Sequence, residues 1–219
     1  MKYIPYLLYL CLVTACVSSG PNDLLIKNSQ CAPPCWNGLT PGETSQPEAL
    51  QVIEGLDGID SEKTKVITAP WKVFNKEIWF YIVRDDFLTK KQTSGALYFI
   101  NDKLAVILLQ LNVGVTFGEM VEMGGEPDVI VSLQSPEAIL VRAILLSRGI
   151  SFDFYARSDQ FSAETRIDNV MFFDSLYYEQ LLDAEMFSLG DYGANDTKKM
   201  MYPWSGYGSI EELYPLVFP

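Results

Sequence analysis

A repeated phrase constrains the fold of this chain more than any other feature. Gly38-Leu39-Thr40-Pro41-Gly42-Glu43 returns as Gly114-Val115-Thr116-Phe117-Gly118-Glu119, with the Gly, Thr, Gly and Glu positions kept. Repetition of a segment indicates repetition of a structural unit, because a unit that cannot bury its apolar face alone is used in copies. The sequence therefore predicts two similar halves.

The first half has the pattern of one helix followed by four strands. Ser45-Gln46-Pro47-Glu48 has the spacing of a capping box with Pro in the first turn, so a helix should begin here. Gly55 and Gly58 offer its end, and its apolar face comprises Ala49, Leu50, Val52, Ile53 and Leu56. Strand-like runs follow at residues 65–68, 78–84, 95–100 and 104–111, the last two joined by a predicted hairpin at Asn101-Asp102-Lys103.

The second half repeats this order. Thr116 and Glu119 form a second capping box, and a short helix carrying Met120, Val121 and Met123 should stop at Gly124-Gly125. Four strand-like runs follow at residues 129–133, 138–146, 150–156 and 165–173, with a tight turn predicted at Ser147-Arg148-Gly149. Apolar and polar residues alternate from Ile150 to Ala156, which predicts a strand with one wet face.

Two registers relate the copies of the phrase. Pairing Gly38 with Gly114, a shift of 76 residues, maximises identity. Pairing Gly42 with Gly114, a shift of 72 residues, aligns the predicted helix starts. We favour the second register, in which the phrase is the helix-starting device of each half.

The C-terminal part follows neither pattern. Asp174 can cap a helix running to about Phe187, with Leu176, Leu181 and Leu182 on its apolar face. Residues 188–219 are rich in Gly, Tyr and Pro and lack strong periodicity. Because aromatic residues recur from Tyr202 to Phe218, we expect a packed irregular cap.

The N-terminal sequence predicts where the protein is located. Met1-Lys2 is a short positive region, and residues 3–13 are apolar but too short to span a bilayer, as in a secretion signal. The stretch ends Leu12-Val13-Thr14-Ala15-Cys16, which resembles the lipobox of bacterial lipoproteins. The resemblance implies that Cys16 is acylated, with fatty acids such as palmitate, and becomes the new N-terminus. The alternative is an ordinary signal peptide with a chance Cys.

The charge limits the possible partners. The chain has 16 Lys and Arg against 28 Asp and Glu, a net charge of −12, and cleavage before Cys16 removes Lys2 and makes it −13. This sign argues against binding nucleic acid or anionic lipid heads, both of which favour Lys and Arg clusters. Membrane attachment should therefore come from the lipid at Cys16. Val17 follows the Cys, so an Asp-type inner-membrane retention signal is absent and either membrane remains possible.

The remaining cysteines form a pair. Cys11 would leave with the signal and Cys16 would carry lipid, which leaves Cys31 and Cys35 as an even pair in an oxidising compartment. A disulfide is the first expectation. It requires the chain to turn at Pro33-Pro34, and a cis bond at Pro34 would supply such a turn. A copper or redox site is the alternative, although the chain has no His to act as a companion ligand.

Two protein families share these patterns. Gly-x-Thr, a short amphipathic helix and Gly124-Gly125-Glu126-Pro127-Asp128 before a strand resemble the BamE (SmpA/OmlA) family of small outer-membrane assembly lipoproteins. The tandem arrangement resembles β-lactamase inhibitor protein, in which two helix-plus-four-strand units present one continuous sheet. The resemblance covers roughly residues 36–173 and carries no binding residue over, and the first half lacks a Pro after its helix.

Catalytic motifs are scarce in the sequence. The lack of His excludes a Ser-His-Asp triad and an HExxH metal site, and neither GxSxG nor GxxxxGK[ST] occurs. A carboxylate pair could still hydrolyse glycans. Its candidates by residue type are Asp85-Asp86, Glu119, Glu122 and Asp153.

Other acidic residues have competing interpretations. Glu119 stands at the third position of a capping box and Glu43 lies beside a Gly before a helix, so structural roles are favoured for both. Calcium binding at Asp57-Gly58-Ile59-Asp60 is conceivable, but the loop lacks the ligand density of an EF-hand. We therefore expect no metal and no cofactor.

Aromatic residues supply a candidate recognition surface. Trp and Tyr are favoured interface anchors, although such residues more often complete a core. The candidates are Trp71, Trp79, Phe80, Tyr81, Trp204 and Tyr207.

Together these patterns predict an α+β fold with two tandem helix-plus-four-strand antiparallel units, a continuous sheet, a C-terminal helix and an aromatic cap. The expected divisions are a signal peptide (1–15), a lipidated tether (16–30), a first unit (31–111), a second unit (112–187) and the cap (188–219). We expect a non-enzymatic, lipid-anchored module on the extracytoplasmic side of the envelope that binds an envelope protein. The alternatives are a carboxylate-dependent hydrolase of cell-wall glycans and an inhibitor of an extracytoplasmic enzyme.

Overall fold

The protein is a mixed α+β fold built on one large antiparallel sheet. The computed structural model describes residues 31–56, 58–68, 72–83, 92–111, 114–135, 137–189 and 193–215. The first part of the chain contains α1 (Gln46–Gly55), β1 (Lys65–Ile67), β2 (Lys76–Val83), β3 (Gln92–Ile100) and β4 (Lys103–Gln110). The middle part contains α2 (Phe117–Gly124), β5 (Val129–Gln134), β6 (Ile139–Leu145), η2 (Leu146–Arg148), β7 (Ile150–Ala156), β8 (Gln160–Phe161) and β9 (Asn169–Phe173). The last part contains η3 (Ser175–Tyr177), α3 (Tyr178–Asp183), α4 (Ala194–Lys199), β10 (Met201–Pro203), β11 (Gly208–Ser209) and α5 (Ile210–Leu213).

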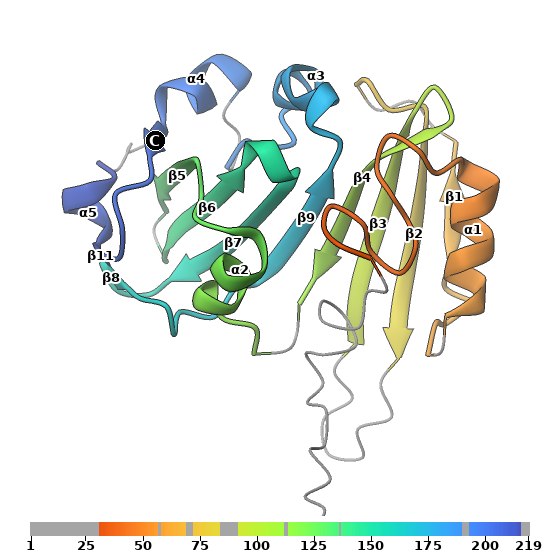
Figure 1. Cartoon of the computed structure of the whole chain (residues 1–219), viewed down its shortest axis with the longest axis horizontal. Helices are drawn as coiled ribbons and strands as arrows, with labels where there is room; N and C mark the ends of the chain where they lie inside the picture. Colours follow the sequence, from red (N-terminus) through yellow and green to blue (C-terminus); the bar gives the residue numbers. More distant parts are fainter. Residues whose placement is uncertain are drawn as a thin grey trace, which may run out of the picture.

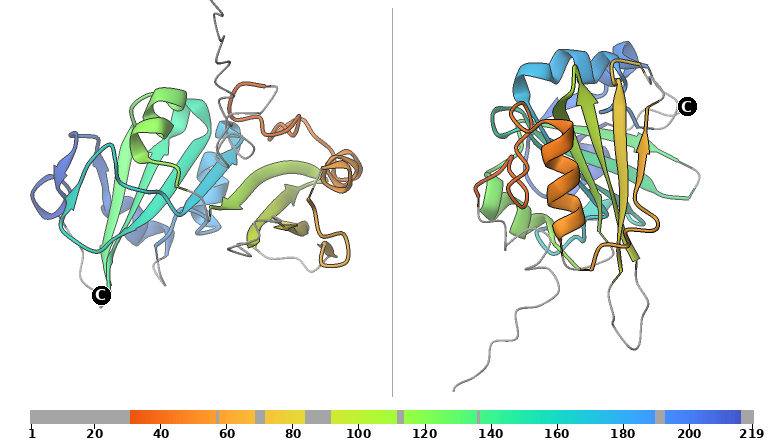
Figure 2. Two further views of the ribbon diagram at one scale, coloured as in Figure 1. Left: turned by 90° about the horizontal axis from the view of Figure 1, so that it is seen from below. Right: turned by 90° about the vertical axis from the view of Figure 1, so that its right-hand side faces the viewer.

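The sheet joins nine strands in the order β1-β2-β3-β4-β9-β7-β6-β5-β10 (Figure 1). All neighbouring strands are antiparallel. The middle of the sheet is the pairing of β4 with β9, where Val106 lies opposite Phe173 and Gln110 opposite Asn169. The sheet twists strongly between its two ends, as antiparallel sheets of this size do (Figure 2).

Both predicted capping boxes begin helices. Glu48 accepts hydrogen bonds from the backbone N–H and the hydroxyl of Ser45, and Glu119 accepts one from the backbone N–H of Thr116. Thr116 in turn accepts from the backbone N–H of Glu119, and Gly125 ends α2 with a φ of 95°. The two caps are 71 residues apart in the sequence, so the predicted register of 72 is wrong by one residue.

Two cores lie on opposite faces of the sheet. One core lies under α1 and α2 and contains Ala49 and Ile53 of α1 and Phe117 and Met120 of α2. The other lies under α3 and the segment after it, which contribute Leu181, Leu182 and Phe187. β4 therefore has buried residues of both parities, as its apolar run predicts.

The C-terminal part is more ordered than predicted. α3 is short and is preceded by η3, whose first turn is capped by Asp174 through the backbone N–H of Leu176. Leu176 was expected on an apolar helix face, but its side chain is 89% exposed. The tail contains α4, α5 and two short strands, β10 pairing with β5 and β11 with β8. The expected irregular cap is therefore partly regular.

The edges of the sheet differ in character. β1 has three residues, all exposed, and begins with Lys65. β10 covers the edge of β5 and ends with Pro203, which lies opposite Val129 and has no N–H to offer another strand. α1 stands at the β1 end of the sheet and α5 at the other end (Figure 1).

Candidate functional site

An aromatic cluster joins α2 to the C-terminal tail. Phe117 is fully buried at the first turn of α2, and its ring lies within 6 Å of five other rings. These belong to Phe152, Phe154, Phe161, Trp204 and Tyr207. Trp204 lies parallel on Phe117, with centroids 5.5 Å apart and ring planes at 15°. The sequence prediction of a packed aromatic cap is confirmed for Trp204 and Tyr207.

Tyr207 is the outermost ring of this cluster. It packs nearly perpendicular to Trp204, with centroids 5.3 Å apart, and against Phe161 at 5.7 Å. Its side chain is nevertheless 41% exposed, whereas Phe117 and Phe161 beneath it are buried. The ring is therefore presented to solvent on an apolar base.

Hydrogen bonds hold the backbone that carries Tyr207. The backbone N–H of Ser205 donates to the Tyr214 hydroxyl at 2.9 Å, and that hydroxyl donates to the carbonyl of Gly206 at 2.9 Å. Gly206 has a φ of 96°, a left-handed conformation that a side chain would strain. Buried Tyr214 thus fixes the turn that places Tyr207.

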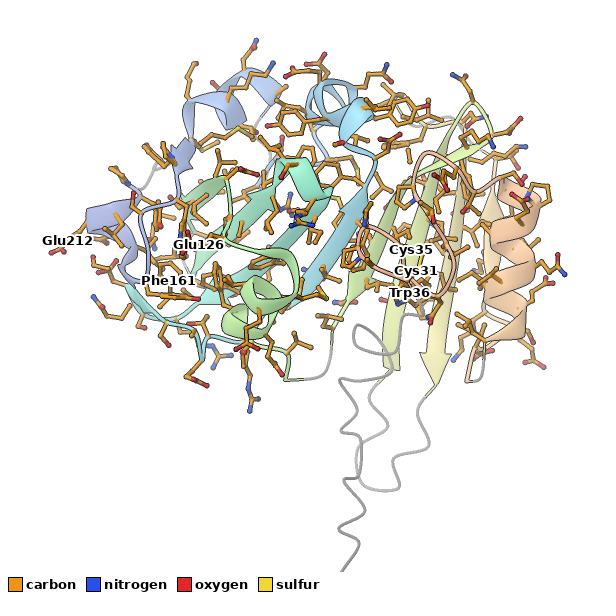
Figure 3. All side chains as sticks on the ribbon, in the orientation of Figure 1. Cys31, Cys35, Trp36, Glu126, Phe161 and Glu212 are labelled. Atoms are coloured by element: carbon orange, nitrogen blue, oxygen red, sulfur yellow. A yellow bond between two sulfur atoms is a disulfide. The ribbon has the colours of Figure 1, made fainter. Side chains whose placement is uncertain are left out.

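Two carboxylates accompany the exposed ring. Burial raises the pKa of the Tyr207 hydroxyl, and Glu126 and then Glu122 raise it further, because negative charge nearby disfavours the phenolate. Both glutamates are exposed, Glu122 in α2 and Glu126 just after it. Figure 3 shows Glu126 and Phe161 in the same region of the molecule, away from Trp36. We call Tyr207, Glu122 and Glu126 the Tyr207 surface.

The aromatic candidates on β2 have different environments. Phe80 is fully buried and stacks on Trp36 with ring centroids 5.7 Å apart. Trp79 and Tyr81 lie half-buried on the opposite face, and the indole N–H of Trp79 donates to Glu77 at 2.8 Å. Trp71 lies outside the described residues. Phe80 is therefore a core residue.

Asp153, a candidate for carboxylate catalysis, is held by an ion pair. Its Oδ2 accepts from Nη2 of Arg142 at 2.6 Å, and both side chains are largely buried. Nη1 of the same guanidinium donates to the carbonyls of Met186 and Ser188. The pair therefore ties β6 and β7 to the segment that follows α3.

Asp168 is a neighbouring carboxylate that the sequence does not single out. Burial raises its pKa; the hydrogen bond from the backbone N–H of Tyr155 lowers it, and the charge of Asp153 raises it. That hydrogen bond, 2.9 Å long, gives the Tyr155 N–H a partner beyond the end of the β7–β9 ladder. Tyr155 itself is 56% exposed on the sheet face opposite α2. Asp168 thus has a structural use that accounts for its position.

Other acidic candidates have local roles. Glu119 caps α2, and Glu122 belongs to the Tyr207 surface. Asp60 pairs with Lys63 at 3.0 Å, and Asp57 lies outside the described residues, as do Asp85 and Asp86. Across the described ranges, no group of three or more His, Cys, Asp or Glu side chains could hold a metal ion.

The repeated phrase contributes to a second surface. Glu43 is exposed, and its carbonyl accepts from Nζ of Lys103 at 2.7 Å. Between residues 38–44 and α1 lies a shallow hollow of about 690 Å³, whose polar lining includes Thr40, Glu43, Glu48 and Gln51. Of the two glutamates in this lining, Glu48 caps α1, and the geometry assigns no chemical role to Glu43.

Cys31 and Cys35 are joined by a disulfide in the structure, with their Cα atoms 5.7 Å apart. The Pro33-Pro34 bond is cis. Asn37 and Gly38 form a two-residue turn, and both have positive φ. The flanking residues Trp36 and Leu39 exchange two backbone hydrogen bonds across it. The Asn-Gly pair is a strong signal for such a turn. Cys16 and the segment 1–30 lie outside the described residues.

Comparisons with known proteins add no relative. No family model, curated protein or solved structure matches the chain. Among the described helices, none is long and apolar enough to cross a membrane.

Proposed function

We propose that this chain is a non-enzymatic lipoprotein of the cell envelope that binds another protein through the Tyr207 surface. The address rests on the segment ending at Ala15-Cys16, with acylated Cys16 as the anchor and residues 16–30 as the tether. The binding role rests on the C-terminal tail. The two parts of the proposal are tested separately.

The observation that carries the binding role is the exposure of Tyr207 on a buried aromatic base. Tyr is enriched among interface residues that dominate binding energy, because it offers a large rigid surface and a polar tip. The Tyr214 hydroxyl fixes the turn beneath it, so little conformational freedom would be lost on binding. The surface is thus preorganised for binding.

The environment of the sheet carboxylates supports binding over hydrolysis. A glycosidase needs one carboxylate as acid and a second as base or nucleophile, both facing a shared substrate. Asp153 is paired with Arg142, and Asp168 accepts a backbone N–H of its own sheet. Both groups are engaged in holding the fold.

We further propose that the chain consists of two tandem units, one ending with β4 and the other with β9. The carbonyl of Thr44 accepts from the N–H of Leu104 at 2.8 Å, and that of Val115 accepts from Ile167 at 3.0 Å. Thr44 and Val115 each immediately precede the residue that caps a helix. Leu104 belongs to β4, the last strand of the first half, and Ile167 lies just before β9, the last strand of the second. This correspondence supports a duplicated unit of the kind seen in BamE-like and β-lactamase inhibitor proteins.

Site-specific photo-cross-linking in the native envelope tests the binding role. A benzophenone amino acid at position 207 should form a discrete adduct with one partner protein, and the same group at position 155 should not. Tyr155 is a matched control because it is also an exposed Tyr, on the opposite face of the sheet. Identical adducts from both positions, or none from position 207, would reject the Tyr207 surface.

A separate experiment tests the proposed signal peptide and the lipid anchor at Cys16. Cys16→Ser, or globomycin treatment of the wild-type strain, should leave the signal uncleaved and the protein without acyl chains. Mass spectrometry of the purified protein measures both. Normal cleavage of the variant and an unmodified Cys16 in the wild type would reject the lipid anchor.

A further inference from the structure

We infer that the Tyr207 surface binds a Lys or Arg side chain from a basic segment of its partner. This inference rests on the proposed binding function and adds the chemistry of the partner. Two independent features of the surface attract a cation: two exposed carboxylates at a helix end and an exposed aromatic ring.

Neither carboxylate takes part in an ion pair among the described residues. In the part of the chain that the structure describes, the ion pairs involve Asp60, Asp102, Asp153, Glu179, Glu185 and Asp196, and neither Glu122 nor Glu126. Glu122 lies in the last turn of α2 and Glu126 lies two residues beyond the end of the helix, so both add negative charge at the same helix end. A bound cation would neutralise part of this charge.

Their position at the end of α2 strengthens the same field. Helix C-termini carry partial negative charge and favour Lys, Arg or His nearby. The last turn of α2 has no basic residue and contains Glu122 instead. Acidic residues are unfavourable at this place for stability alone, and such local conflicts mark sites of function.

The exposed ring supplies the second attraction. A cation within about 6 Å of an aromatic centroid is attracted to the face of the ring. Phe161 and Trp204 contact Tyr207 at 5.7 and 5.3 Å and hold it in place, while 41% of the side chain stays open to solvent. Arg fits best, because its planar guanidinium can stack on the ring and donate to carboxylates at its edges.

A peptide pair can test the chemistry directly. Mature acylated protein in neutral detergent is titrated by calorimetry with a hexapeptide of arginine and with the same peptide made of citrulline, the neutral analogue of arginine. The arginine peptide should bind, the citrulline peptide should bind at least tenfold more weakly, and affinity should fall as salt shortens the range of the interaction. Equal binding of the two peptides would overturn the inference.

Variants locate the binding. Glu122→Gln/Glu126→Gln should weaken the arginine peptide roughly three- to tenfold, and Tyr207→Leu roughly two- to fivefold, whereas Tyr207→Phe should retain the ring's contribution. Glu54→Gln/Glu62→Gln is the matched control, since both residues are exposed acids outside the described ion pairs and belong to the first half of the chain. An equal loss in this control would show attraction to net charge only and would reject the site.

The outcomes separate this inference from the binding role itself. Partner adducts at position 207, together with equal binding of arginine and citrulline peptides, would leave the binding role standing and remove the basic partner. Binding that is lost in millimolar Ca²⁺ or Mg²⁺ but kept in NaCl of the same ionic strength would assign the carboxylates to a metal and also overturn the inference. Each variant is checked for an unchanged thermal unfolding midpoint before titration.

Discussion

Phe117 and Trp204 lie face to face, with ring centroids 5.5 Å apart, although one begins α2 and the other belongs to the C-terminal tail. The stacking fixes the tail against the second half of the sheet. The backbone N–H of Trp204 adds to this by donating to the carbonyl of Asp128, just before β5. The tail is therefore part of the same core as α2.

Replacing Phe117 by Ala should destabilise the whole domain. The side chain is fully buried and contacts rings from β7, β8 and the tail, so its loss should lower the free energy of unfolding by about 3–5 kcal/mol. Urea unfolding followed by tryptophan fluorescence measures the change. Tyr155→Ala, at an exposed ring, should cost less than about 0.5 kcal/mol. Equal stability of the two variants would contradict a cooperative aromatic core.

The Arg142–Asp153 pair should be strongly coupled. Asp153→Asn leaves a largely buried guanidinium without its carboxylate and should cost about 1–3 kcal/mol, and Arg142→Met also loses the bonds to Met186 and Ser188. A double-mutant cycle should therefore give a double-variant cost well below the sum. The exposed pair of Lys198 and Glu179 serves as the control and should show coupling below about 1 kcal/mol. Additive costs for Arg142 and Asp153 would show that the pair is not coupled.

Asp168 should make the protein lose stability as pH rises. Burial raises the pKa of this carboxyl in the folded chain, so folding favours its protonated form. The contribution to stability is complete below the unfolded pKa of about 3.9 and is lost as pH rises through the folded value. Asp168→Asn cannot ionise but can still accept from Tyr155. The stability of the variant relative to wild type should therefore increase between about pH 4 and pH 7. A difference that stays constant or decreases would contradict this assignment.

The Cys31–Cys35 bridge should stabilise the protein only modestly. On the chain-entropy model, a loop of this size contributes about 2 kcal/mol to the free energy of unfolding. Cys31→Ser/Cys35→Ser should lower stability by about this amount, and the wild-type protein should take up no thiol reagent at these residues without reductant. Labelling of both cysteines in protein isolated from the envelope would reject the bridge in the mature chain.

Local signals predicted much of the sheet. The capping boxes at Ser45 and Thr116 place both long helices, and the eight predicted strand runs correspond to β1–β7 and β9. The hairpin at Asn101 and Asp102 follows from a turn in which both residues adopt positive φ. These features depend mainly on residues that are close in the sequence, so a local pattern is enough to predict them.

The elements that the sequence did not predict depend on distant contacts. β8, β10 and β11 have two or three residues each and exist because another strand lies beside them. Distant contacts also decide the position of Leu176. It has the spacing of an apolar helix face, but it lies in η3 and is exposed to solvent. Periodicity shows which face a helix would bury, and tertiary packing decides whether the helix forms there.

The candidate site was half visible in the sequence. Trp204 and Tyr207 stood out as recognition residues by type, and Glu122 was noted only as a possible catalytic acid. Their meeting with Glu126 requires the tail to fold back on α2. Asp168 had no signal at all, because its role is to accept a backbone N–H that becomes free only where the β7–β9 ladder ends.

The placement of β10 has a consequence for the order of folding during synthesis. Until Met201–Pro203 pairs with β5, the edge of β5 is an unpaired strand with buried Ile130, Val131 and Leu133 beside an open aromatic cluster. Exposed edges of this kind pair with other chains. The domain can therefore close only after the chain has been made through β10. A nascent chain or a product truncated before β10 should be a substrate for chaperones or proteases.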